Sequence, residues 1–193
     1  MDFFKKYVQQ MCENIKEVDT RELDKATTMI IGAAVNNGKA IIVGNGGSAA
    51  IASHVSVDLT KNTRVRAINF NEADLITCFA NDYGYERWVE KALDFYAQSQ
   101  DVLILISSSG RSKNILNAAL KAKEMGMKLI TFSGFDEANP LRSMGHINFW
   151  VNNSSYNIVE MTHHVWLLAI VDKIIEHIGE QSSKTELQNT KKG

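Results

Sequence analysis

Apolar and polar residues alternate along the chain in two periods, one typical of helices and one typical of strands. Residues 2–17 and 21–36 carry apolar residues at helical spacing. Asp19 and Thr20 suit the cap of the second segment, and Asn37-Gly38 suits its end. We therefore expect two amphipathic helices ahead of the first strand, packed either on the chain's own sheet or on a neighbouring subunit.

From residue 40 onward, strand and helix patterns alternate. Val102–Ile106 is apolar without interruption, as expected of a strand buried on both faces of a parallel sheet. Short apolar runs predict strands at 40–43, 66–69, 102–106, 128–132 and 147–151, and helical spacing predicts helices after residue 48 and at 74–80, 85–97, 112–125 and 158–178. Residues 81–84 have the composition of a turn. This order predicts an α/β fold, a doubly wound five-stranded parallel sheet with an N-terminal two-helix extension.

The pattern shows no linker that would divide the chain. We expect one domain over residues 1–180. Residues 181–193 are polar and without period, and the sequence predicts a disordered tail there.

Composition narrows the class of partner and the compartment. The 193 residues are 45% apolar and 22% charged, and the formal net charge of −1 argues against nucleic acid as the main partner. There is no apolar run of the length needed to span a membrane, and the start of the chain lacks the apolar region of a signal peptide. Cys12 and Cys78 form neither a disulfide framework nor a CxxC pair. We expect a cytoplasmic protein, free of membranes, with two reduced and buried thiols.

The first candidate binding element is the turn Gly44-Asn45-Gly46-Gly47-Ser48, between a strand and a helix. Glycines allow the backbone to approach a ligand closely, and a helix N-terminus favours a phosphate. Gly44, Gly46 and Ala49 also fit a dinucleotide fingerprint, with Glu72 a little over twenty residues on. That alternative is generic and leaves the second polar loop unexplained.

The second candidate element is Ser107-Ser108-Ser109-Gly110-Arg111-Ser112, which follows the buried strand and opens a helix. Helix capping accounts for one or two of these serines. Four serines in six positions exceed that need, and their hydroxyl and N–H groups are suited to surrounding a phosphate.

Together the two loops resemble those of the sugar isomerase (SIS) domain family, and within it the chain is most similar to the phosphoheptose isomerases. The resemblance is carried by GNGGSAAIASHVSVDLT, FANDYG at 79–84, ISSSGRSKNILNA at 106–118 and IVEMTHH at 158–164, and it covers residues 1–178. It implies a flavodoxin-like SIS fold, a homotetramer with sites at subunit interfaces, and conversion of sedoheptulose 7-phosphate to a heptose 7-phosphate through an enediol.

The resemblance also implies roles for individual residues. Those that match family positions binding the sugar phosphate are Asn45, Gly46, Gly47, Ser48, Asp82, Ser107, Ser108, Ser109 and Ser112. His54 and Asp58 match a pair of metal ligands whose acidic member is the proposed base, and they lie four residues apart on one helix face. The implied metal is zinc, with Glu160 as a further ligand, and Glu160 or His163 is the implied catalytic partner of Asp58.

Two departures from the family pattern leave alternatives open. Leu168 stands where the family has a second histidine, which serves as zinc ligand and acid–base group, and Asp58 is one methylene shorter than the usual glutamate. His164 lies about 100° around the helix from His163 and does not simply replace the lost histidine. The alternatives are a non-catalytic SIS sugar-phosphate sensor or protein-binding scaffold, and an isomerase of a different sugar phosphate.

Overall fold

The computed structural model describes residues 2–190, and the side chains of residues 2–180. Its centre is a five-stranded sheet with strand order β2-β1-β3-β4-β5, in which every neighbouring pair is parallel. The strands are β1 (Ala40–Gly44), β2 (Ala67–Ile68), β3 (Val102–Ser107), β4 (Lys128–Gly134) and β5 (Ile147–Val151). The predicted fold class and all five predicted strands are confirmed, although β2 is shorter than the sequence pattern indicated.

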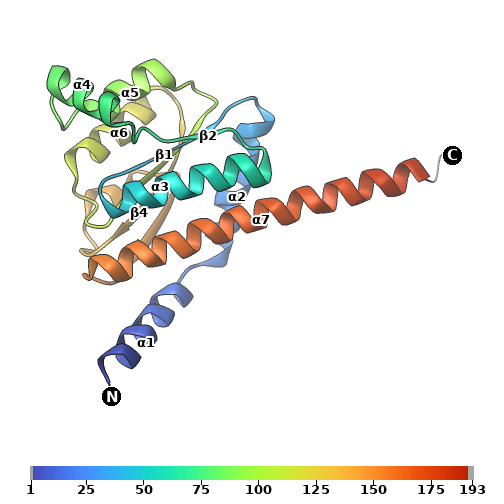
Figure 1. Ribbon diagram of the computed structural model, residues 1–193, viewed down its shortest axis with the longest axis horizontal. Helices are drawn as coiled ribbons and strands as arrows, with labels where there is room; N and C mark the ends of the chain where they lie inside the picture. Colours follow the sequence, from blue (N-terminus) through green and yellow to red (C-terminus); the bar gives the residue numbers. More distant parts are fainter. Residues whose placement is uncertain (1, 191–193) are drawn as a thin grey trace.

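Helices cover both faces of this sheet (Figure 1). One layer contains α2 (Thr20–Val35), α3 (Gly47–Asp58), the π-helical turn η1 (Leu59–Thr63) and α7 (Tyr156–Thr190), and the other contains α4 (Ala73–Tyr83), α5 (Trp88–Tyr96), α6 (Lys113–Glu124) and the 3-10 turn η2 (Pro140–Ser143). Successive side chains of β3 point alternately into the two helical layers, because side chains along a strand alternate in direction. Ile104 packs with α3 and α7, whereas Leu103 and Leu105 pack with α5 and α6.

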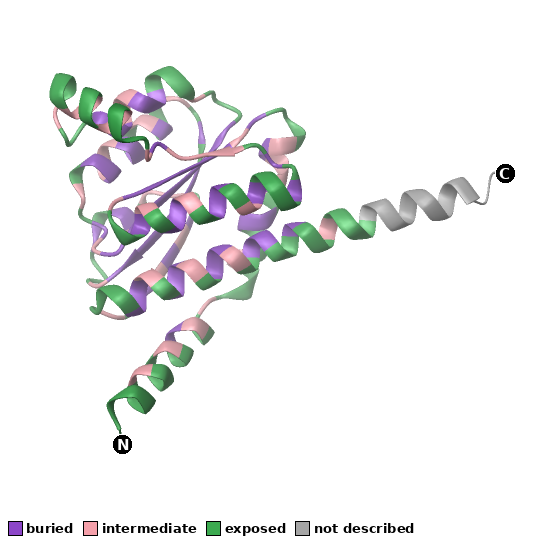
Figure 2. Cartoon of the chain, viewed as in Figure 1, coloured by how far each residue is buried: buried purple, intermediate pink, exposed green. Residues whose placement is uncertain are grey.

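The two N-terminal helices pack differently. Helix α2 buries Ala26, Ile30 and Ala33 in the layer that contains α3 and α7. Helix α1 (Phe3–Lys16) contacts α7 instead, where the Trp166 indole N–H donates to the Ile15 carbonyl over 2.9 Å. It extends away from the sheet (Figure 1) and leaves a green, exposed outer face (Figure 2). This face includes Phe3, Phe4 and Val8, whose exposed fractions are 69%, 71% and 59%.

The prediction of buried thiols is wrong, because Cys12 and Cys78 are both free and exposed. Cys12 lies on the uncovered side of α1. Cys78 lies on α4, a helix that rests on α5 with none of its own described residues buried. Helical spacing identified both helices, but it does not show how little of each helix is covered.

The structure also differs from the sequence prediction at the ends of two helices, α4 and α7. Residues 81–83 form the last turn of α4 rather than a separate turn, and Gly84 ends the helix at a φ of 85°. Helix α7 continues past residue 178 to Thr190, through part of the predicted disordered tail, and residues 191–193 lie outside the described residues. Residues 181–190 contain no glycine or proline that would end a helix. Within residues 2–190, no helix combines the length and apolar character that crossing a membrane requires.

Candidate active site

A cavity of about 290 Å³ lies beyond the carboxyl ends of β1 and β3, where open parallel sheets bind their ligands. Its lining joins the two predicted loops to the start of α7. The lining residues are Asn45, Gly46, Gly47, Ser48, Ile106, Ser107, Ser108, Ser109, Ser112, Tyr156 and Glu160. The cavity therefore contains every predicted substrate-binding residue except Asp82. Ile106 and Tyr156 are additional, and nothing in the local sequence pattern distinguished them from ordinary strand and helix residues.

The first loop needs its glycines at two positions. Gly46 has φ 55° and ψ −122°, a conformation that other residues adopt only with strain. At Gly47 the limit is space, because a Cβ atom there would collide with the Glu160 carboxylate. The absence of a side chain at residue 47 thus lets Glu160 reach the N-terminus of α3. Ser48, at the second position of α3, is buried in the cavity wall.

The second loop is built for more than helix capping. Ser112 occupies the N-cap position of α6, yet within the described structure its side chain makes no capping hydrogen bond to the helix. It pairs instead with Ser107, whose Oγ lies 3.3 Å from Ser112 Oγ. The Ser109 hydroxyl accepts from the Arg111 N–H, also over 3.3 Å. The N-terminus of α6 is therefore left free of a side-chain cap on the cavity side.

Ser108 gives the clearest sign of a ligand. Its hydroxyl is buried, lines the cavity and has no hydrogen-bond partner among the described residues. Leaving a buried hydroxyl unpaired costs on the order of 1–3 kcal/mol. A phosphate oxygen in the cavity would satisfy it, together with the neighbouring hydroxyls and two helix N-termini.

Glu160 brings a carboxylate into the same cavity from the second turn of α7. Partial burial raises its pKa, because desolvation disfavours the charged form. A carboxylate with a raised pKa is suited to accepting and returning a proton. The cavity thus combines hydroxyl and N–H donors for an anion with one group capable of proton transfer.

His54 and Asp58 lie on α3 but do not line this cavity. His54 Nε2 is 3.2 Å from Asp58 Oδ2, and His54 Nδ1 is 2.9 Å from Nε2 of His164 on α7. Burial lowers the pKa of His164, and the adjacent His54 lowers it further. The sequence predicted the first pair but not the participation of His164.

The three implied zinc ligands are not brought together. Glu160 lies against Gly47, and His54 is seven residues further along α3, about 10 Å along the helix axis. One ring nitrogen of His54 faces Asp58, and the other faces His164. A metal ion bound to one of these nitrogens could therefore not be bound by both Asp58 and His164. No group of three or more His, Cys, Asp or Glu side chains in the described chain is placed to hold a metal. The residues of one chain therefore do not fit the implied zinc site.

Two further predicted residues lie elsewhere. His163 is completely buried, between the Phe132 and Trp166 rings, and its Nε2 lies 2.9 Å from the Ser133 carbonyl. It does not line the cavity, which argues against its expected catalytic role. Asp82 is exposed in the last turn of α4, where its carboxylate accepts from the Asn81 amide. It too lies outside the cavity of the single chain.

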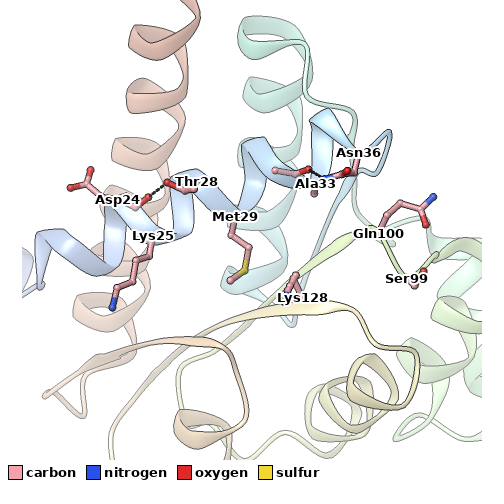
Figure 3. A pocket seen from close by; sticks show the side chains of 10 residues that line it. Asp24, Lys25, Thr28, Met29, Ala33, Asn36, Ser99, Gln100 and Lys128 are labelled. Carbon is pink, nitrogen blue, oxygen red and sulfur yellow. Dashed lines mark hydrogen bonds between the residues drawn. The ribbon is translucent and has the colours of Figure 1, made fainter.

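A larger groove of about 910 Å³ lies near the start of β3 and β4, beneath α2 (Figure 3). Met29 points from α2 toward it, and Lys25, Gln100 and Lys128 are among its other lining residues (Figure 3). It contains none of the loop serines and none of the predicted catalytic groups. The smaller, polar cavity is therefore the candidate active site.

Fold and cavity together define an α/β domain whose cavity is suited to a phosphate group, and the chain belongs to the SIS domain family, which matches residues 3–134. Within that family its similarity is to phosphoheptose isomerases. The enzyme of Helicobacter pylori strain P12 is 32% identical over 186 residues, covering 92% of this chain and 93% of the relative. That of strain HPAG1 is 36% identical over 155 residues, covering 76% and 79%.

Solved structures agree with this similarity. The phosphoheptose isomerase of Neisseria gonorrhoeae superposes with a TM-score of 0.80 at 26% identity, covering 89% of this chain and 94% of that one. The enzyme of Francisella tularensis superposes with a TM-score of 0.81 at 26% identity, covering 91% and 95%. The similarity thus extends over nearly the whole length of both proteins.

Proposed function

We propose that this protein is a phosphoheptose isomerase that converts sedoheptulose 7-phosphate to the corresponding aldose, a glycero-manno-heptose 7-phosphate. One observation carries the proposal above the others: Ser108 presents a buried, unpartnered hydroxyl to a cavity that also contains the Glu160 carboxylate. The relatives from Helicobacter pylori strain P12 and Francisella tularensis, which cover 92% and 91% of this chain, bear this name.

In this proposal the phosphate occupies the serine-lined part of the cavity. Ser107, Ser108, Ser109 and Ser112 surround it from one loop, and Ser48 donates from the other. The uncapped start of α6 adds partial positive charge where the phosphate is negative. Phosphate binding at one end of the sugar then holds the other end in a fixed position for proton transfer.

The reaction moves one proton and one carbonyl. A carboxylate removes the proton from C1 of the ketose, the electrons of that C–H bond form the C1–C2 double bond, and the C2 carbonyl oxygen takes a proton from water to become a hydroxyl. The carboxylate then returns its proton to C2, where the electrons of the double bond form the new C–H bond. The C1 hydroxyl releases its proton to water as the C1 carbonyl forms, which gives the aldose. We assign the carboxylate to Glu160, since it lines the cavity and its pKa is raised.

Asp58, the base implied by the family pattern, is a second candidate for this carboxylate. It lies with His54 outside the cavity of the single chain. A role for Asp58 therefore requires a site that a neighbouring subunit completes. A role for Asp82 likewise requires a neighbouring subunit. So would a zinc ion, whose ligands His54, Asp58 and Glu160 would have to come from more than one chain.

We propose a homotetramer for this reason. Support comes from the exposed apolar side chains of α1, at Phe3, Phe4 and Val8. Light scattering on the purified protein tests it, with a tetramer expected. A stable monomer with full activity would contradict both the assembly and any role for Asp58.

We also propose a cytoplasmic location, because Cys12 and Cys78 are exposed free thiols, which suit a reducing compartment. Titration with a thiol reagent should find both thiols reactive in protein purified without reductant. Oxidised cysteines would contradict this location.

The direct test of function is turnover of sedoheptulose 7-phosphate by the purified protein, with the aldose product followed in the presence of zinc and in the presence of a chelator. Formation of the aldose is expected. Binding of the sugar phosphate without turnover would contradict the enzyme and favour the second candidate function, a sugar-phosphate sensor or scaffold. The observation behind that candidate is Leu168, which packs against the apolar core where the family pattern has a histidine.

A further inference from the structure

The two phosphate loops are joined by a reciprocal pair of side-chain amides. The Asn45 Nδ2 group donates to Asn114 Oδ1 over 3.0 Å, and the Asn114 Nδ2 group donates to Asn45 Oδ1 over 2.9 Å. Asn45 belongs to the first loop and lines the cavity. Asn114 is the second residue of α6, directly after the second loop, and is only 2% exposed. The pair therefore connects the two sides of the cavity, from a partly exposed Asn45 to a buried Asn114.

The pair also fixes which end of the Asn45 amide is available to a ligand. Asn45 Oδ1 accepts from Asn114 and, over 3.3 Å, from the hydroxyl of Tyr85. Tyr85 lies in the segment between α4 and α5, which Asn117 of α6 holds by donating to the Glu86 carbonyl. With its oxygen engaged twice, Asn45 keeps one amide hydrogen for a further acceptor. An N–H donor suits an anionic or hydroxylated sugar phosphate.

We propose that Asn114 is a positioning residue for the sugar-phosphate site. It holds Asn45 in the orientation that presents an N–H group, and it keeps the two loops at the separation at which both contact one ligand. Tyr85 assists by occupying the second acceptor position of Asn45. This inference rests on the proposed function only in taking a sugar phosphate as the ligand.

The predicted consequence is energetic coupling between Asn45 and Asn114, because Asn114 acts through Asn45. Binding of inorganic phosphate is measured by calorimetry for the wild-type protein, Asn45→Ala, Asn114→Leu and the double variant. Each single variant is expected to bind about tenfold more weakly. The double variant should be no more than about twofold weaker than the weaker single variant, because contacting residues are non-additive.

A matched control separates this role from a loss of stability. Asn148 is half-buried and, like Asn114, has both ends of its amide bonded, in this case to Thr131 and Gly145, but it lies on β5 outside the cavity. Asn148→Leu should lower the melting temperature and leave phosphate affinity unchanged. Asn114→Ser replaces Asn114→Leu if the latter does not fold. Tyr85→Phe changes an exposed residue and tests the second hydrogen bond to Asn45 Oδ1 independently. We expect this variant to bind phosphate about threefold more weakly.

Two results would overturn the inference: single effects that multiply in the double variant, or an Asn114 variant that binds phosphate as tightly as Asn148→Leu does. Because phosphate binding is measured without turnover, this outcome is distinct from failure of the proposed reaction. If the wild-type protein binds phosphate but does not isomerise sedoheptulose 7-phosphate, the proposed reaction is wrong. The phosphate affinities of the variants still test the coupling of Asn45 to Asn114.

Discussion

The Glu160 carboxylate lies directly against Gly47, so close that any side chain at residue 47 would displace it. This contact joins the start of α7 to the start of α3 and places the proposed proton-transferring group at the mouth of the phosphate loops. The site also requires an anion cradle, which is formed by the serines at the end of β3 and in the loop that leads to α6. The site therefore combines residues from distant parts of the chain.

Replacing Gly47 by alanine should reduce turnover of sedoheptulose 7-phosphate by about 100-fold, because misplacement of a catalytic group by about 1 Å has effects of this size. Steady-state kinetics on Gly47→Ala measures the effect. Gly32→Ala is the matched control, since a Cβ atom at Gly32 on α2 meets no atom within 4 Å. It should keep full activity and gain up to about 1 kcal/mol of stability. Equal activity of the two variants would contradict the proposed contact.

Replacing Ser108 by alanine should weaken binding of inorganic phosphate by about tenfold. The same change should leave the free energy of unfolding unchanged or raise it by about 1 kcal/mol, because it removes an unpaired buried hydroxyl. Calorimetry and denaturant unfolding provide the two measurements. Loss of stability with unchanged phosphate affinity would show that the hydroxyl serves the fold and not a ligand.

His163 should control stability at acidic pH and not catalysis. Burial lowers its pKa from 6.5 to about 4, because its Nδ1 has no partner among the described residues and a proton there would be unsatisfied. The unfolded chain therefore binds the proton more readily between these pKa values. The stability contribution is complete above about pH 6.5 and falls by about 3 kcal/mol as pH decreases to 4.

His163→Gln removes this titration while keeping an amide that can donate to the Ser133 carbonyl. The difference in unfolding free energy between wild type and His163→Gln should shift in favour of the variant as pH falls through this window. Turnover at neutral pH should stay within about threefold of wild type. A loss of turnover by 100-fold, with normal stability, would restore His163 as a catalytic residue.

Sequence reasoning predicted the sheet and both loops because their signals are local. Apolar runs identify buried strands, and the glycine and serine clusters at 44–48 and 107–112 are unusual in composition. What it could not supply is which helix faces are covered. Cys12 and His163 each lie on a helix with an apolar stripe, yet one is exposed and the other fully buried. That difference arises from packing between α1, α7 and β4.

The site itself was predicted in part. The loop serines and Glu160 converge as expected, whereas His54, Asp58 and Asp82 lie outside the cavity. Helical spacing correctly placed His54 and Asp58 on one face, but it could not show that His164 of α7 would meet them there. Asn114 was equally hidden, because its role depends on a contact 69 positions away in the sequence.

The central claim is that Glu160 transfers a proton between C1 and C2. Glu160→Gln removes the basic carboxylate with little change in shape, and general-base contributions are typically 10²–10⁴-fold. The variant should lose at least about 100-fold in turnover while it binds phosphate with wild-type affinity. Asp58→Asn is the comparison, and a larger loss there with an active Glu160→Gln would transfer the role of base to Asp58.

The most direct measurement is isomerisation of sedoheptulose 7-phosphate by the wild-type protein in D₂O, with the aldose product analysed by NMR. A proton held on a carboxylate between removal and return exchanges with solvent, so we predict deuterium at C2 of the product. With Glu160→Gln, both product formation and exchange should be at least about 100-fold slower. Either of two results would contradict proton transfer by Glu160: aldose formed without deuterium at C2, or a Glu160→Gln variant that is as active as the wild-type protein.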